Sequence, residues 1–250
     1  MAAPMDVQEF INSNAFSTFQ RNILILCFLV VTVDGFDTAS IGFIAPAIKA
    51  EWQLSAAALA PLFGAGLFGL MSGALIFGPL ADRFGRKPIL IFSVAFFGLA
   101  SLLSVFSTGL PMLLVLRFLT GLGLGGAMPS AVTLTSEYCP QGRRASLVTL
   151  MFCGFTVGSA LGGLVAAQML SSMGWRGVLC VGGVLPLLLV PLLAFKLPES
   201  LRFLLEKGKN GEQVARIVAC IAPHAKAPDL MVSDKKLTGS PVASLFRQGM

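Results

Sequence analysis

The sequence predicts an all-α, polytopic membrane protein. Hydrophobic residues make up 55% of the 250 residues and charged residues only 12%, whereas an average soluble domain carries about 25% charged residues. The charges are also unevenly distributed, because only 16 of the 30 charged residues lie in residues 1–195. A chain this apolar cannot form a water-facing surface, which excludes a soluble enzyme, a disordered protein and a disulfide-stabilised secreted module.

Long stretches without charged residues indicate how many times the chain crosses the membrane, because one helical span needs about 20 mostly apolar residues. These stretches are residues 52–81, 88–116, 118–136, 145–175 and 177–195. Together with the turn signals between them, they predict six helices at about 23–48, 56–81, 88–106, 111–138, 145–170 and 176–195. No stretch alternates polar and apolar residues in the way that the strands of a membrane barrel do.

The basic loops indicate how the bundle is oriented. Three cations lie in loop 82–87 and two in loop 139–144, whereas the loops at the other end hold at most one each. Short positive loops stay in the cytoplasm. We therefore expect a cytoplasmic N-terminus at 1–22, a six-helix bundle at 23–195 and a cytoplasmic central segment at 196–250. The net charge of +6 then needs no nucleic-acid partner.

No pattern in the sequence points to a cofactor, a metal ion or enzyme chemistry. The five cysteines lack the paired spacing of a zinc or redox site, and the single histidine, His224, lies among prolines. Four glycines, at 121, 123, 125 and 126, lie inside a predicted helix and so do not form a dinucleotide-binding turn. Their density instead favours close approach of another helix.

Two carboxylates lie inside the first predicted helix, where a charged residue is costly and indicates function. Asp34 lies near the expected middle of the membrane, and Asp37 follows three residues later on the same helix face. Two close carboxylates in a poorly hydrated cavity repel each other, which favours uptake of a proton. We interpret the pair as a proton carrier; the alternative is a structural pairing with a cation on another helix.

Arg117 is the candidate cation for such a pairing. It lies roughly 9 Å inside the outer end of the fourth predicted helix. Its guanidinium could bind a substrate carboxylate through two parallel hydrogen bonds. It could equally pair with Asp37 if the two helices are neighbours. The sequence leaves both roles open, and the two can alternate during a cycle.

The loop between the second and third predicted helices carries a dense motif. Residues 78–87 read Gly-Pro-Leu-Ala-Asp-Arg-Phe-Gly-Arg-Lys and resemble the signature loop of the major facilitator superfamily. The motif positions are Gly78, Asp82, Arg83, Gly85, Arg86 and Lys87. Glu137, at the inner end of the fourth helix, should lie level with this loop and pair with Arg83 or Arg86. Such a cluster would latch the inward face shut; the alternative is a solvated positive loop.

A narrower resemblance rests on residues 34–38, 117–129 and 135–138, which are similar to the aromatic acid:proton symporters. This resemblance implies that Asp34 and Asp37 couple protons and that Arg117 and Glu137 are needed for transport. It also implies import of a small aromatic carboxylate, such as 4-hydroxybenzoate, with a proton across the bacterial inner membrane. Two alternatives are a sugar or other organic-acid carrier of the superfamily and a non-transporting membrane partner.

The superfamily resemblance also implies twelve helices in two halves, with the substrate cavity between them. We expect this chain to be the N-terminal half, built as two three-helix repeats with the first and fourth helices lining the cavity. A missing C-terminal half, or a second copy of the chain, would complete the cavity. Residues 201–222 should form a short amphipathic helix and residues 223–250 a polar connector.

Overall fold

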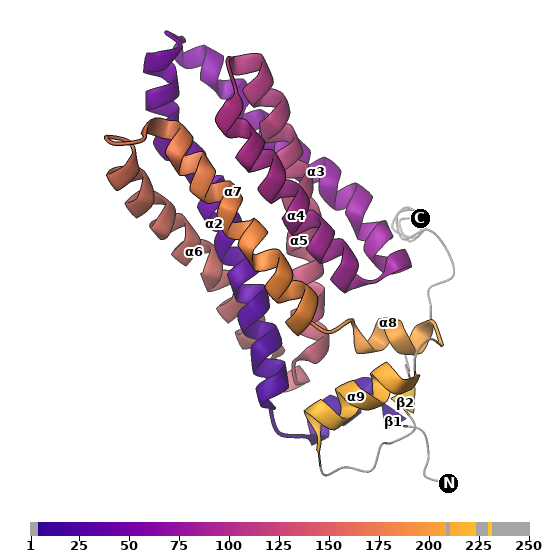
Figure 1. Cartoon of the computed structure of the whole chain (residues 1–250). Coiled ribbons are helices and arrows are strands. Elements are labelled where there is room, and N and C mark those ends of the chain that lie inside the picture. The colour runs from indigo at the N-terminus through magenta and orange to yellow at the C-terminus, as the bar shows by residue number, and fades with distance from the viewer. Residues whose placement is uncertain (1–4, 209–210, 224–229, 232–250) are drawn as a thin grey trace, which may run out of the picture.

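Six long helices dominate the computed structural model, which describes residues 5–208, 211–223 and 230–231 (Figure 1). They are α2 (Thr18–Glu51), α3 (Ala56–Phe84), α4 (Arg86–Leu103), α5 (Leu110–Tyr138), α6 (Arg144–Met169) and α7 (Gly174–Lys196). The 3₁₀ turn η1 (Ser104–Phe106) follows α4, and η2 (Gln141–Arg143) precedes α6. All six long helices have the length and composition to cross a membrane. The predicted all-α, six-helix fold is confirmed.

The helix that differs most from its predicted range is α2, which extends beyond 23–48 at both ends. Its start is set by a reciprocal pair of hydrogen bonds. The Ser17 side chain accepts from the backbone N–H of Gln20, and the Gln20 side chain accepts from the backbone N–H of Ser17. This capping arrangement satisfies N–H groups that the first helical turn otherwise leaves unpaired.

The six helices form two three-helix units with matching contacts. α3 packs along α5 and α6 packs along α2, so the second helix of each unit lies against the first helix of the other. Likewise α4 contacts α5, α7 contacts α2, and α4 and α7 pack against each other (Figure 1). This exchange of partners agrees with the predicted pair of three-helix repeats.

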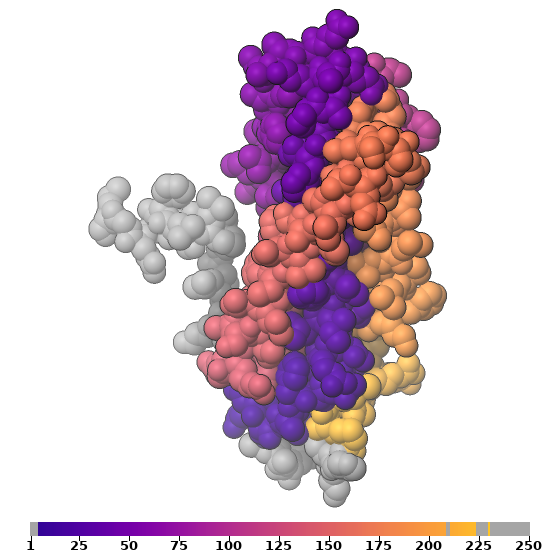
Figure 2. All heavy atoms as spheres, turned by 90° about the vertical axis from the view of Figure 1, so that its left-hand side faces the viewer, coloured from indigo at the N-terminus to yellow at the C-terminus, as the bar shows by residue number. Residues whose placement is uncertain are grey.

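Glycines let α2 and α6 approach each other closely. Gly158 of α6 lies against the backbone of Thr32 in α2, and Gly35 of α2 lies against the backbone of Phe155 in α6. In the space-filling view, α6 forms a band that crosses α2 (Figure 2). Such contacts matter in a membrane, because helices there associate mainly through close packing.

Replacing Gly158 by alanine should therefore weaken the packing of α6 on α2. A Cβ at this position would overlap the carbonyl oxygen of Thr32, and overpacking of this kind costs about 1–3 kcal/mol. Thermal unfolding of the purified chain in detergent should show a lower midpoint for Gly158→Ala. Gly42→Ala is the matched control, because a Cβ at Gly42 would meet nothing within 4 Å. An equal effect of both changes would contradict the packing argument.

A layer of short elements, which we call the collar, covers one end of the bundle (Figure 1). The collar consists of α1 (Val7–Ser13), α8 (Leu201–Glu206), α9 (Gly211–Ile221) and the parallel pair of β1 (Met5–Asp6) with β2 (Leu230–Met231). Phe10 and Ile11 of α1 and Ile217 of α9 are buried in the same apolar core as residues of the long helices. The basic loops also lie at this end, so we call it the basic end.

The collar differs from the prediction in two respects. The single helix expected at 201–222 is divided into α8 and α9. The chain turns after α8 at Gly208, whose φ of +58° is a left-handed conformation that favours glycine at helix ends. In addition, α1 has no counterpart among the predicted helices. The connector expected at 223–250 lies outside the described residues, apart from Pro223 and β2, and so does His224.

Candidate functional site

A buried ion pair joins α5 to α2. Arg117 Nη1 lies 3.0 Å from Asp37 Oδ2, and each side chain is only 3% exposed. Ser101 of α4 lies beside both partners: its hydroxyl donates to Asp37 Oδ1 at 2.7 Å and accepts from Arg117 Nη2 at 3.3 Å. Three helices from both repeats therefore each contribute one member of a closed hydrogen-bonded triangle.

This triangle satisfies most of the polar groups that burial would otherwise penalise. A buried charge is tolerated when it is paired and hydrogen-bonded, and the Asp37–Arg117 pair meets both conditions. One donor remains, because Arg117 Nε is buried without a hydrogen-bond partner in the described structure. Nε is therefore a nitrogen of the guanidinium whose N–H a further acceptor could use.

Asp34 lies one helical turn away from this triangle, and no described cation forms an ion pair with it. Its side chain is buried, and its Oδ1 accepts a hydrogen bond from the Thr38 hydroxyl at 3.2 Å. Its Oδ2 is buried and has no partner among the described residues. Asp34, Asp37, Ser101 and Arg117, which we call the buried cluster, thus combine one unused donor with one unused acceptor.

The glycine run of α5 explains how Arg117 comes this close to its partners. Gly121 and Gly125 lie against the backbone of α3, at Gly66 and Leu70. Gly123 and Gly126, on another side of the helix, contact Phe97 and Ser93 of α4. Because small residues face both neighbours, α5 packs tightly into the bundle. The run therefore acts in helix packing, as its density in the sequence predicts.

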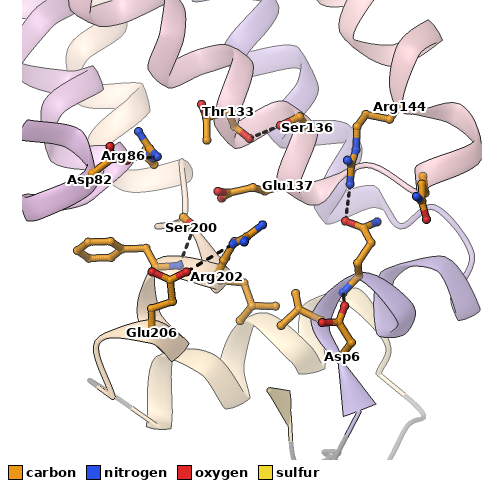
Figure 3. Close-up of a pocket in the computed structure, with 15 residues that line it drawn as sticks. Asp6, Asp82, Arg86, Thr133, Ser136, Glu137, Arg144, Ser200, Arg202 and Glu206 are labelled. Carbon is orange, nitrogen blue, oxygen red and sulfur yellow. Dashed lines mark hydrogen bonds and ion pairs between the residues drawn. The ribbon is translucent and has the colours of Figure 1, made fainter. Parts of the chain in front are cut away.

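A second group of charged residues surrounds a cavity of about 670 Å³ at the basic end, which we call the basic-end cavity. Glu137 points into its middle, with Arg86 on one side and Arg202 on another (Figure 3). Glu137 Oε2 is buried and has no hydrogen-bond partner within the part of the chain that the structure describes. The wall opposite Arg86 carries Arg144, whose guanidinium hydrogen-bonds Gln8 of α1.

Among the described residues, Glu137 forms no ion pair with Arg83 or Arg86 in this conformation, although Arg86 lines the same cavity. The guanidinium of Arg86 instead pairs with Asp82, one helical turn earlier. Arg83 lies 5.4 Å from the centre of the Phe84 ring and lines a separate pocket that also includes Lys87. Adjacent residues of the signature loop point in different directions, so the structure brings only Asp82, Arg86 and Glu137 to one cavity. A Cβ at the remaining motif position, Gly78, would meet nothing within 4 Å.

Glu199 is a residue that the sequence reasoning missed. Its Oε1 accepts hydrogen bonds from the backbone N–H groups of Arg86 at 2.9 Å and Lys87 at 3.1 Å. A carboxylate suits this position, because the first N–H groups of a helix are unpaired and carry partial positive charge. Gly85 makes room for it, since a Cβ there would overlap Glu199 Oε2, and its φ of +111° also favours glycine. Glu199 thereby fastens the segment after α7 to the start of α4.

The other missed residue is Ser101, for which the sequence offers no signal beyond a small polar residue in an apolar helix. Glu199, by contrast, lies in the stretch Pro198-Glu199-Ser200 directly after the last span. The sequence alone assigns no role to its carboxylate, because helix capping across the chain depends on the tertiary structure.

The chain is similar in sequence to known bacterial transporters. The chain is 52% identical to the 4-hydroxybenzoate transporter PcaK of Pseudomonas aeruginosa over 219 residues, which are 88% of this chain and 49% of that protein. It is 48% identical to the gallate transporter of Pseudomonas putida over 217 residues, which are 87% of this chain and 48% of that protein. The chain thus spans about half the length of the curated relatives that it matches.

A solved structure has the same fold. The proton:xylose symporter XylE bound to 6-bromo-6-deoxy-D-glucose matches with a TM-score of 0.72 at 24% identity, over 84% of this chain and 50% of that chain. The sequence model described as Major Facilitator Superfamily matches residues 27–245. The chain is therefore a multi-pass membrane protein, and it belongs to the Major Facilitator Superfamily, as the signature loop at 78–87 predicts.

Proposed function

We propose that the protein to which this chain belongs imports an aromatic carboxylate together with a proton by alternating access. The observation that carries this proposal is the buried cluster: Asp34, with one unsatisfied carboxylate oxygen, lies one helical turn from Asp37, which pairs with the buried guanidinium of Arg117. The names of the relatives support a ring acid, since two of them are transporters of 4-hydroxybenzoate and gallate. A cation inside the bundle favours an organic acid over an uncharged sugar.

In this proposal, Arg117 changes partners during the cycle. The buried guanidinium is unfavourable without an anion, and Asp37 supplies one when no substrate is bound. A substrate carboxylate could use the unpaired Nε and one Nη group in a two-pronged contact. Asp37 would then lose its cation, which favours its uptake of a proton. Substrate binding and proton binding would become linked through one residue.

Asp34 is the second proposed proton carrier. Its buried Oδ2 lacks a partner in the described region, and a charged carboxylate is unfavourable in such a place. A proton on this carboxyl removes the cost of burial. Two carboxyls with different surroundings on one helix could then take up protons at different stages, one with and one without help from the substrate.

The arrangement in the membrane is also proposed. We place the basic end and the collar in the cytoplasm of a bacterial cell, with residues 1–22 and 196–250 flanking the bundle at 23–195 on that side. The positive loops support this orientation. We further propose that a second six-helix half, or a second copy of this chain, completes the substrate cavity, because the matched relatives are about twice as long.

Transport of a ring acid by the whole protein can be tested directly in proteoliposomes. Radiolabelled 4-hydroxybenzoate should accumulate inside when the outside is more acidic, and a protonophore should abolish the accumulation. Unlabelled gallate should compete with the label, whereas xylose should not. Uptake that ignores the protonophore would contradict proton coupling, and uptake of xylose but no ring acid would favour a sugar carrier.

We also propose that Asp82, Arg86 and Glu137 around the basic-end cavity hold this end closed in one state of the cycle. Contacts made in only one state shift the population when they are lost. Asp82→Asn and Glu137→Gln should each raise the maleimide labelling rate of an introduced Thr133→Cys reporter severalfold in the whole protein. Glu212→Gln, on the exposed face of α9, is the matched control. Unchanged labelling in both cavity variants would refute the latch.

A further inference from the structure

A second pocket at the basic end differs from the basic-end cavity in its charge. This pocket, which we call the cationic pocket, has a volume of about 680 Å³. Its lining contains four cations, Arg83, Lys87, Lys207 and Arg216, and one carboxylate, Glu199. The basic-end cavity, by contrast, has Asp6, Asp82, Glu137 and Glu206 beside its three arginines. An excess of positive charge is therefore particular to the cationic pocket.

The single carboxylate of the cationic pocket is already engaged. Glu199 Oε1 accepts backbone hydrogen bonds at the start of α4, from Arg86 and Lys87. The negative charge of Glu199 therefore interacts with the N-terminus of α4 and is shared between this terminus and the neighbouring cations. The pocket thus keeps a net positive charge that a bound anion could neutralise.

The four cations have little other compensation. Arg83, Lys87 and Lys207 form no ion pair with any residue that the structure describes. Arg216 pairs with Glu212 at 3.7 Å, but these side chains are 79% and 89% exposed, and exposed pairs contribute little. Side chains from the signature loop, α8 and α9 therefore converge with unneutralised charge.

The position of the cationic pocket suggests what kind of anion it takes. Its wall includes Phe195 at the end of α7 and Phe84 at the end of α3, which are 86% and 57% exposed. Further along the packed pair of α7 and α4, Leu188 and Phe92 are also exposed. Figure 1 shows α8 crossing just beyond the end of α7. The pocket thus lies where apolar spans end and charged elements begin.

We propose that the cationic pocket binds the headgroup of an anionic phospholipid, whose acyl chains lie along the exposed apolar face of α7 and α4. Basic pockets at the cytoplasmic ends of membrane helices suit such headgroups, because positive charge and an apolar wall meet there. A free phosphate ion would use the cations, but it would leave the exposed apolar surface of Phe195 uncovered. The cationic pocket is separate from the buried cluster, so the lipid proposal does not depend on which substrate the protein carries.

Electron spin resonance of spin-labelled lipids tests the proposal in phosphatidylcholine vesicles that contain the 250-residue chain. Labelled phosphatidylglycerol should be motionally restricted by the protein severalfold more than labelled phosphatidylcholine, and added salt should weaken this preference. Lys207→Gln/Arg216→Gln should lose most of the preference. Lys207 directly follows α8 and Arg216 lies in α9, so the six spans remain unchanged.

The matched control is Arg21→Gln/Arg143→Gln, which removes two exposed cations of the same end that do not line the cationic pocket. This variant should keep the preference for phosphatidylglycerol. Equal loss in both double variants would reveal general attraction to the basic end and overturn the site, as would the absence of any preference. Displacement by inorganic phosphate at constant ionic strength would show a soluble anion site and also overturn the lipid proposal.

Discussion

Asp37→Asn is expected to destabilise the chain by roughly 3–5 kcal/mol, because removal of one partner leaves the other charge buried and uncompensated. The affected partner is Arg117, whose only ion pair in the described structure is with Asp37. Ser101 would keep one polar contact with the guanidinium, but a hydroxyl cannot neutralise a charge. Unfolding of the purified chain by denaturant in mixed micelles measures the change in free energy.

The double variant Asp37→Asn/Arg117→Met separates charge from packing. It removes both charges and keeps an apolar side chain of similar length, so it should recover most of the lost stability. Asp34→Asn is the second comparison. No described cation pairs with Asp34, so this variant should be nearly as stable as the wild-type chain. Equal destabilisation by Asp34→Asn and Asp37→Asn would contradict the assigned pairing.

The effects of Asp34→Asn and Asp37→Asn on transport should differ from their effects on stability. In the whole protein, both Asp34→Asn and Asp37→Asn should abolish proton-driven accumulation of 4-hydroxybenzoate, although only Asp37→Asn lowers stability. Asparagine keeps the shape of the side chain but cannot exchange a proton. Full accumulation by both single variants, with normal amounts of protein in the membrane, would exclude the coupling role.

Arg117→Lys should lower the affinity of the whole protein for an aromatic acid about ten- to a hundredfold, since one charged hydrogen bond is worth about 1.5–3 kcal/mol. In the structure, Nη1 contacts Asp37, Nη2 contacts Ser101 and Nε is unpartnered. Three donors therefore point in different directions from one planar group. Lysine keeps the charge but lacks this geometry, so stability should fall less than affinity.

Binding of 4-hydroxybenzoate at two pH values is the measurement for Arg117→Lys. Wild-type protein should bind more tightly at the lower pH, because release of Asp37 is linked to proton uptake, and the variant should lose much of this dependence. Arg176→Lys is the control, since Arg176 pairs with Glu51 at the opposite end of the bundle. Wild-type affinity and pH dependence in Arg117→Lys would leave Arg117 as a structural ion pair.

The membrane helices could be predicted because their determinants are local. Uncharged stretches of sufficient length give each span directly, and the cations of the short loops mark their ends. The sequence left open whether Arg117 would meet Asp37, because that contact depends on which helices are neighbours. The glycines at 121 and 125 indicated close packing, but they did not identify α3 as the neighbour.

The charged residues of the basic end were less predictable. Asp82, Arg83 and Arg86 are close in sequence, yet Arg83 turns toward the cationic pocket while Arg86 pairs with Asp82. Consecutive residues of a helix point about 100° apart, so Asp82 and Arg83 at the end of α3 face different surroundings. The helix cap by Glu199 joins residues more than a hundred positions apart, and no local pattern encodes such a contact.

The collar also has a consequence for the biosynthesis of the protein. α1 precedes the six long helices in the chain, but the partners of α1 and β1 are made much later: the Gln8 side chain donates to the carbonyl of Cys139, and Met5 pairs with Leu230. Because domains begin to fold from their N-terminal side during synthesis, α1 has no completed binding surface while the first spans enter the membrane. Phe10 and Ile11 share an apolar core with Ile217 of α9, so they reach their final surroundings only after α9 has been made, although they precede all six spans.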